Sequence, residues 1–98
     1  MKYELHSTVV FDKWFLKLKD AVTKRKVLAR LARIENGNFG DFKQIHTNLY
    51  ELRFFFGSGI RIYYTIRNDR IILLLAGGDK ASQKADIQKA KNLLNEME

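Results

Sequence analysis

Two apolar strands separated by Gly57-Ser58-Gly59 constrain the fold of this chain more than any other feature. The even positions of residues 49–56 are apolar, and so are the even positions of residues 60–67. Facing residues of an antiparallel pair share a face of the sheet, so even positions must pair with even positions. A three-residue loop satisfies this rule by placing Phe56 opposite Ile60, with the last glycine in the left-handed conformation. The sequence therefore predicts an antiparallel hairpin of this register.

The odd positions of the two strands are expected to form an outer, solvent-facing surface that is basic and aromatic. In this register Arg53 lies opposite Tyr63 and Phe55 opposite Arg61, which makes the two arginines diagonal neighbours. Arginines can clamp phosphate, and flat rings can stack on splayed bases. An ordinary solvated sheet face with arginine–tyrosine pairs is the alternative interpretation. The residues predicted on this surface are Glu51, Arg53, Phe55, Arg61 and Tyr63.

Periodic patterns in the rest of the chain predict an α+β fold, in which helices cover one face of a small, mainly antiparallel sheet. Asp12 and Asp20 are candidate caps for the two helices of an N-terminal helical hairpin joined near Lys19-Asp20. Asn36-Gly37-Asn38 is a helix stop. The predicted order is a strand at 2–10, helices at 11–18 and 20–35, strands at 42–46, 49–56, 60–67 and 70–76, and a helix from Ser82. Asn68-Asp69 is the predicted two-residue loop of the second hairpin.

Gly77-Gly78-Asp79-Lys80 joins the last strand to the last helix. Its spacing is not that of a phosphate-binding P-loop, and a glycine pair that leaves a buried strand is typical of a tight turn. The free N–H groups of the following helix would nonetheless favour an anion. Asp79 or Ser82 could cap that helix. The turn would present Lys80 at the rim of the arginine surface.

The charge of the chain favours a polyanionic partner. Eighteen basic and eleven acidic side chains give a net charge of +7, and the excess lies in the first third of the chain. Nucleic acid, the ribosome, an acidic membrane face or an acidic protein would complement this charge, while solubility alone is the plainer explanation. Lys24-Arg25-Lys26 is either a solvated helix face or a docking patch for RNA.

Several classes of protein and site are not indicated by the sequence. There is no cysteine, no segment that resembles a signal peptide and no apolar run long enough to span a membrane. We therefore expect one soluble cytoplasmic domain over residues 1–98. Carboxylates are scattered, so neither a metal nor another cofactor is expected. His6 and His46 could act as acid and base in a metal-free ribonuclease, or be structural or exposed.

Several stretches of this sequence resemble the addiction module killer proteins, a subgroup of the RelE/HigB toxins within the RelE/ParE superfamily. The resemblance covers almost the whole chain, from Phe11 onward. Its most specific parts are Glu51-Leu52-Arg53, residues 59–64 and Gly77-Gly78-Asp79-Lys80, with Gln83, Asp86 and Ile87 downstream. It implies a RelE-like fold and the toxin of a type II toxin–antitoxin pair, of which many members cut mRNA in the ribosomal A site.

The resemblance also implies roles for individual residues. A ribose 2′-hydroxyl would attack the adjacent phosphate, and basic side chains would stabilise the developing charge. On this basis Arg53 and Arg61 bind the scissile phosphate, Lys80 adds charge or acts as general acid, and Glu51 accepts a proton. The implied RNA-binding residues are Tyr63, Phe55, Lys43, His46, Lys24, Arg25 and Lys26. Several well-known members have a catalytic histidine or tyrosine near the C-terminus, and this chain has neither after Tyr64.

The resemblance implies partners and leaves rival functions open. We expect a cognate antitoxin, a small helix-turn-helix protein encoded next to the toxin, together with the ribosome and mRNA, and no membrane. ParE-like toxins share the fold but inhibit DNA gyrase without cutting RNA, so fold alone does not decide between the two. A plain RNA-binding module is the third alternative.

Overall fold

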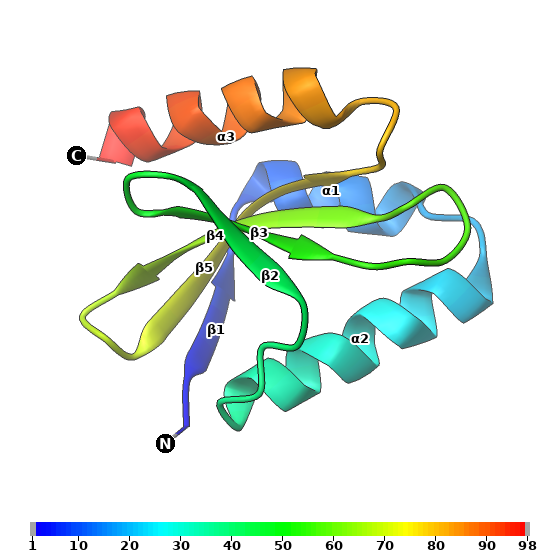
Figure 1. The fold of residues 1–98 in the computed structure, drawn as a ribbon, viewed down its shortest axis with the longest axis horizontal. Helices are drawn as coiled ribbons and strands as arrows, with labels where there is room; N and C mark the ends of the chain where they lie inside the picture. The colour runs from blue at the N-terminus through cyan, green and yellow to red at the C-terminus, as the bar shows by residue number, and fades with distance from the viewer. Residues whose placement is uncertain (1, 98) are drawn as a thin grey trace.

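A computed structural model describes residues 2–97 of the chain (Figure 1). These residues form three helices and a five-stranded sheet. In chain order the elements are β1 (Glu4–Ser7), α1 (Val9–Lys17), α2 (Ala21–Glu35), β2 (Phe42–His46), β3 (Leu49–Arg53), β4 (Arg61–Arg67), β5 (Ile71–Gly78) and α3 (Gln83–Met97).

The sheet is mainly antiparallel, with the strand order β1-β5-β4-β3-β2. Three of its four strand pairs are antiparallel, and β1 alone runs parallel to its neighbour, β5. In chain order the helical hairpin, α1 and α2, comes between β1 and β2, and α3 follows β5, the last strand. This confirms the predicted α+β fold, with its N-terminal helical hairpin and C-terminal helix.

Helices cover both faces of the sheet, so the expectation that they cover one face was wrong. Figure 1 shows α3 and α2 on opposite sides of the strands. On one side Phe11 of α1 and Val27, Leu31 and Ile34 of α2 pack on the even-numbered side chains of β3 and β4. On the other side Ala90 and Leu94 of α3 are buried in a second cluster. That second cluster includes Leu49, Tyr63, Leu75 and Ala76 of the sheet.

In the first hairpin even positions face even positions, as predicted, but the pairing is shifted by two residues from the predicted register. Arg53 pairs with Arg61 and Glu51 with Tyr63, so even positions do face even positions. The strands separate after Arg53, and a longer loop, residues 54–60, connects them. Gly59 has φ +76°, which confirms its predicted left-handed conformation. The two arginines are therefore direct neighbours across the strand pair and not diagonal ones.

The second hairpin also differs from its predicted register. Arg67 pairs with Ile71, which leaves a loop of three residues, and Arg70 N–H donates to the Arg67 carbonyl across it. Asn68 and Asp69 both have positive φ, a conformation that asparagine and aspartate tolerate better than most residues. An irregularity between Tyr63 and Tyr64 then shifts the pairing, so that Arg61 lies opposite Gly78.

The helix boundaries follow short polar signals. Asp20 caps α2 as predicted, and α2 ends at Glu35, just before Gly37 at φ +89°. The opening strand is shorter than expected, because Thr8 already caps α1 through a hydrogen bond from the Phe11 N–H to its Oγ1. Asp12, the predicted cap, lies within the first turn and accepts a hydrogen bond from the Ser7 hydroxyl.

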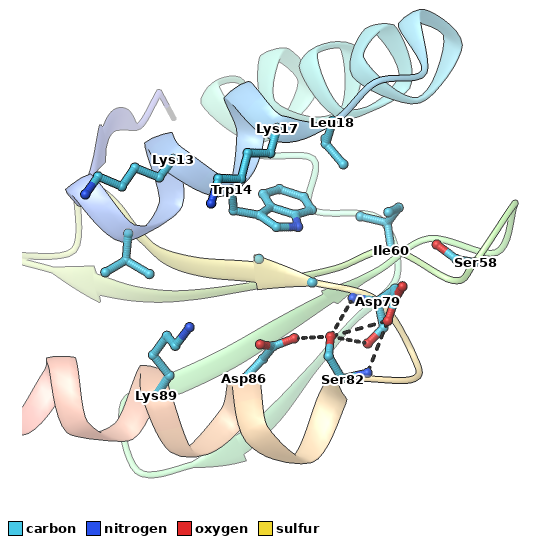
Figure 2. Close-up of a pocket in the computed structure, with 13 residues that line it drawn as sticks. Lys13, Trp14, Lys17, Leu18, Ser58, Ile60, Asp79, Ser82, Asp86 and Lys89 are labelled. Atoms are coloured by element: carbon cyan, nitrogen blue, oxygen red, sulfur yellow. Dashed lines mark hydrogen bonds between the residues drawn. The ribbon is translucent and has the colours of Figure 1, made fainter.

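Gly77 and Gly78 lie within β5 and allow both layers of helices to approach it, so the predicted tight turn at this pair was wrong. A Cβ on Gly77 would overlap the Trp14 ring of α1, and a Cβ on Gly78 would overlap the Asp86 carboxylate of α3 (Figure 2). The chain turns after them instead. Ser82 N–H donates to Asp79 Oδ1, and Asp79 N–H donates to Ser82 Oγ, so both candidate caps close the turn.

None of the helices in residues 2–97 is long and apolar enough to cross a membrane.

Candidate functional site at the loop between β3 and β4

Four predicted site residues gather at the loop that joins β3 and β4. The loop is closed by a hydrogen bond from Phe54 N–H to the Ile60 carbonyl and is tied to the start of α3 by one from Lys80 N–H to the Ser58 carbonyl. We call the group the loop site and define it as Arg53, Phe55, Arg61 and Lys80.

Arg61 lies beneath the loop and holds its shape. Its Nη1 donates to the carbonyl oxygens of Phe54, Gly59 and Ile60 at 3.2 to 3.3 Å. Its Nε is 4.0 Å from Glu51 Oε1. Only 7% of Arg61 is exposed, so the expectation of an arginine on an open surface was wrong for this residue. The buried Arg61 side chain therefore stabilises the loop through hydrogen bonds to its backbone carbonyls.

Glu51 is buried between the sheet and α3. It is 1% exposed, and its Oε2 accepts a hydrogen bond of 2.7 Å from Gln83 Nε2. This burial contradicts the expectation that Glu51 lies on an open, solvent-facing surface. The first turn of α3 covers it, and the sequence reasoning did not place that helix on this face. Gln83, Glu51 and Arg61 thus link α3 to the loop.

Tyr63 is also covered by α3. Its side chain is fully buried, which contradicts the expectation that its ring stacks on a base at an open surface. Burial, and after it the negative charge of Glu51, raises the pKa of the Tyr63 hydroxyl well above its ordinary value. A phenol in this environment stays protonated at neutral pH.

Phe55 is a highly exposed member of the loop site. Its ring is 75% exposed, and the guanidinium carbons of Arg53 and Arg61 lie 5.6 and 5.9 Å from the ring centroid. Arg53 is partly exposed and pairs with Asp41, with its Nε 3.4 Å from Asp41 Oδ2. The arrangement presents an open aromatic face beside two cations, which is suited to a stacked base and its phosphate.

Two cavities meet at Phe55. One, of about 360 Å³, is lined by residues 54–59 together with Arg61 and Lys80. The other, of about 300 Å³, is bounded by Arg53 and by basic residues of α2, namely Lys26, Arg30 and Arg33. Lys80 itself is exposed. The loop site therefore opens onto cationic hollows on both sides of one exposed ring.

Arg30 supports the loop site, although it is not among the predicted site residues. Its Nε, Nη1 and Nη2 donate to the carbonyls of Phe39, Arg53 and Asp41 at 3.0, 3.0 and 2.6 Å. Burial lowers its pKa from the ordinary value for arginine. Its place between the apolar Val27, Leu31 and Ile34 at helical spacing was the signal that it points inward.

The other predicted RNA-binding residues surround the loop site or lie away from it. Lys26 approaches the loop, with its Nζ 4.2 Å from the Phe56 ring centroid. Lys24 lies 5.7 Å from the Phe15 ring, farther along the hairpin, and Arg25 is exposed on α2. Lys43 is exposed on β2 opposite Glu51.

The two histidines are not brought together. His6 is on β1 and His46 on β2, and these strands are the two edges of the sheet, about 19 Å apart at the usual strand spacing. His46 pairs with Leu49 at the start of β3, whereas Arg53 is at its end, about 13 Å away by strand rise. An acid–base pair of histidines is therefore excluded, and His46 lies outside the loop site.

Comparisons with known proteins agree with this geometry at the level of fold and family. The model of the family described as "Phage derived protein Gp49-like (DUF891)" matches residues 13–97. An uncharacterized protein of Haemophilus influenzae is 41% identical over 97 residues, which cover 99% of this chain and 98% of the relative.

Solved structures of the Escherichia coli toxin RelE share the fold. The isolated toxin superposes with a TM-score of 0.64 at 14% identity, covering 85% of this chain and 94% of RelE. A double mutant of RelE in the free state gives 0.63 at 18% identity, with coverages of 88% and 94%. The intact RelBE toxin–antitoxin complex gives 0.62 at 16% identity, with coverages of 79% and 95%. The RelE-like fold implied by the sequence resemblance is thus confirmed, and the chain belongs to the Gp49-like family of phage-derived proteins.

Proposed function

We propose that this chain is a single-domain toxin of a type II toxin–antitoxin pair and that it cuts mRNA at the ribosome. The observation that carries the proposal is the loop site, an exposed phenylalanine flanked by two guanidinium groups on a RelE-like fold. A cytoplasmic location follows from this activity. The expected antitoxin is a small helix-turn-helix protein encoded next to the toxin.

In the proposed reaction a ribose 2′-oxygen attacks the adjacent phosphorus and the bond from phosphorus to the 5′-oxygen breaks. The 2′-hydroxyl proton is lost and the leaving oxygen gains one. The partly exposed Arg53 and the exposed Lys80 neutralise the negative charge that grows on the phosphate, and this step requires no metal. Lys80 is the candidate donor to the leaving oxygen, and solvent water takes the proton of the 2′-hydroxyl.

The buried residues take positioning roles in this proposal. Arg61 holds the loop carbonyls that set the place of Phe55, and Glu51 holds Arg61. Phe55 stacks on a base next to the scissile phosphate. Lys26 and Arg25 of α2, with Lys24 and Lys43 farther out, attract the RNA backbone.

The test is inducible expression with growth measurement and primer extension on a translated message. The informative variant is Arg53→Ala/Lys80→Ala, because both side chains reach solvent and their loss leaves the buried network intact. The matched control is Arg70→Ala/Lys84→Ala, which removes the same charge at exposed positions outside the loop site. Circular dichroism checks that both variants fold.

We expect new cleavage ends with the wild type and the control variant, and at least a hundredfold fewer with the loop-site variant. Growth arrest by the wild type without new ends would contradict the nuclease and point to a protein target such as gyrase. Binding of RNA without growth arrest, in cells that lack the neighbouring antitoxin gene, would point to a plain RNA-binding module.

A further inference from the structure

A cleft of about 490 Å³ lies between α1 and the start of α3, next to the loop site (Figure 2). Ser58 of the loop between β3 and β4 lines this cleft, and it also lines the hollow that contains Arg61 and Lys80. That hollow shares Phe55 with the hollow beside α2. The three hollows therefore follow one another across the surface, and we call this succession the track.

Exposed basic side chains line both ends of the track. In the cleft they are Lys13 and Lys17 of α1 and Lys89 of α3, which extend from its two walls (Figure 2). In the hollow beside α2 they are Lys26 and Arg33. All but Lys89 come from α1 and α2, the part of the chain that carries the excess of positive charge. The track therefore uses the charge that the loop site alone leaves unexplained.

The carboxylates of the cleft are engaged within the protein. Asp86 is only 9% exposed, and it accepts a hydrogen bond from the Ser82 hydroxyl. Asp79 accepts one of 3.1 Å from the Ser82 N–H. The charge that reaches solvent in the cleft is therefore mainly that of the three lysines, and this charge favours a polyanion.

Between its lysines the cleft is apolar. Trp14, Val10 and Leu18 of α1 line it together with Ile60. The Trp14 ring covers Gly77, so the cleft offers side chains to a ligand and not the edge of β5. An apolar surface bordered by lysines suits a single strand of nucleic acid, because its bases are unpaired and its phosphates recur at every nucleotide. A duplex keeps its bases inside and could use only the lysines.

We propose that the track is the path of a single RNA strand, and that the cleft holds the part of the strand that adjoins the nucleotides at the loop site. Lys13, Lys17 and Lys89 contact its phosphates, and its bases lie against the apolar lining. The inference rests on the proposed function, since it extends the site at which the RNA is cut.

Trp14 makes the inference measurable, since it is the single tryptophan of the chain and lines the cleft. The full-length protein is titrated with a 2′-O-methyl nonauridylate, which cannot be cut because its 2′-oxygens are blocked. We expect a saturable change in tryptophan emission. In a ¹H–¹⁵N spectrum we expect the single indole N–H signal to shift.

Lys13→Ala/Lys17→Ala should weaken binding of this oligonucleotide at least tenfold. The slope of log affinity against log salt should become shallower by about 1.4, since each lost phosphate contact on a single strand contributes about 0.7. The matched control, Arg70→Ala/Lys84→Ala, removes the same charge outside the track and should change affinity less than twofold. An oligoglutamate of equal charge should bind the wild type at least tenfold more weakly, because it has no bases to lie against the apolar lining.

Three results would overturn the inference: no change in Trp14 emission, equal losses in the cleft variant and the control variant, or equal affinity for the oligoglutamate. Each would leave the proposed function standing if the wild type still produces new mRNA ends in cells. Binding of the oligonucleotide in the cleft as expected, but without new ends in cells, would support the track and contradict the nuclease. The two proposals can therefore fail separately.

Discussion

Glu51 and Arg61 lie side by side beneath the first turn of α3, with Arg61 Nε 4.0 Å from Glu51 Oε1. Both side chains are almost fully buried, so removing one leaves the other charge without compensation. Truncating one partner of a buried pair costs about 3–5 kcal/mol. We therefore expect Glu51→Ala to lower the free energy of unfolding by about 3 kcal/mol in urea denaturation.

The pair formed by Arg53 and Asp41 is the matched control, because about a third of each side chain is exposed. Water screens such a pair, and Asp41→Ala should cost less than about 1 kcal/mol. Equal losses for the two variants would show that burial does not set the value of the Glu51–Arg61 contact.

Gly78→Ala tests the close approach of α3 to β5. The new Cβ would overlap the Asp86 carboxylate, so α3 or the strand must shift, at a cost of about 2 kcal/mol or more. Gly57→Ala is the control, since nothing lies within 4 Å of a Cβ there and only its positive φ matters, at about 1 kcal/mol. Thermal and urea unfolding measure both, and a smaller loss at Gly78 than at Gly57 would contradict the packing described above.

Arg30→Lys should destabilise the chain although the charge is kept. Arg30 binds three carbonyls with three different nitrogens, and the single ammonium of lysine cannot reach all of them. Unpaired buried carbonyls cost about 1–3 kcal/mol in total, to be measured by urea unfolding. The neighbouring Arg33→Lys, at an exposed position, should change stability by less than about 0.5 kcal/mol. If both variants unfold alike, Arg30 is not the support of the loop.

Alkaline pH should weaken the fold through Tyr63 and Tyr64. Burial raises the pKa of both hydroxyls in the folded chain, whereas unfolded tyrosines lose their protons near pH 10. The folded state therefore binds more protons above pH 10, and its stability is constant below that pH and falls above it. The limit for two protons is about 2.7 kcal/mol per pH unit.

Tyr63→Phe/Tyr64→Phe should remove that part of the alkaline loss. The Tyr64 hydroxyl has no hydrogen-bond partner within residues 2–97, and the Tyr63 hydroxyl interacts only with the buried Glu51 carboxylate, so the double variant should differ from the wild type by about 1 kcal/mol or less at pH 7. Urea unfolding from pH 8 to 11 compares the two proteins. An unchanged slope in the variant would assign the alkaline loss to other groups.

The fold could be predicted where the alternation of apolar residues, or a single capping or helix-ending residue, determines the local structure. The alternation in β3 and β4 determined which side chains share a face, and Asp20 and Gly37 marked the limits of α2. The register was not predictable, because hydrogen bonds from Arg61 to loop carbonyls stabilise a longer loop than the glycines alone indicate. Because the register is shifted by two residues, the same side chains still share each face of the sheet.

The residues that form the loop site could be predicted, but the burial of their side chains could not. Arg53, Phe55, Arg61 and Lys80 do gather, because strand pairing and the start of α3 bring them together. Glu51, Tyr63 and Arg61 were expected in the open, and they are buried because α3 packs on their face of the sheet. The sequence of an amphipathic helix does not indicate which face of a distant sheet the helix will cover. The role of Arg30 could not be predicted for a related reason, because its partners are backbone carbonyls, which every residue has.

The parallel pairing of β1 with β5 has a consequence for how the chain acquires its structure during synthesis. The first strand, Glu4–Ser7, pairs with Ile71–Leu74, 67 residues later. Contacts of such long sequence separation form slowly, and this one cannot form until β5 has been translated. The N-terminal strand must therefore stay unpaired through the synthesis of the intervening residues, and the sheet closes only after β5 has been made.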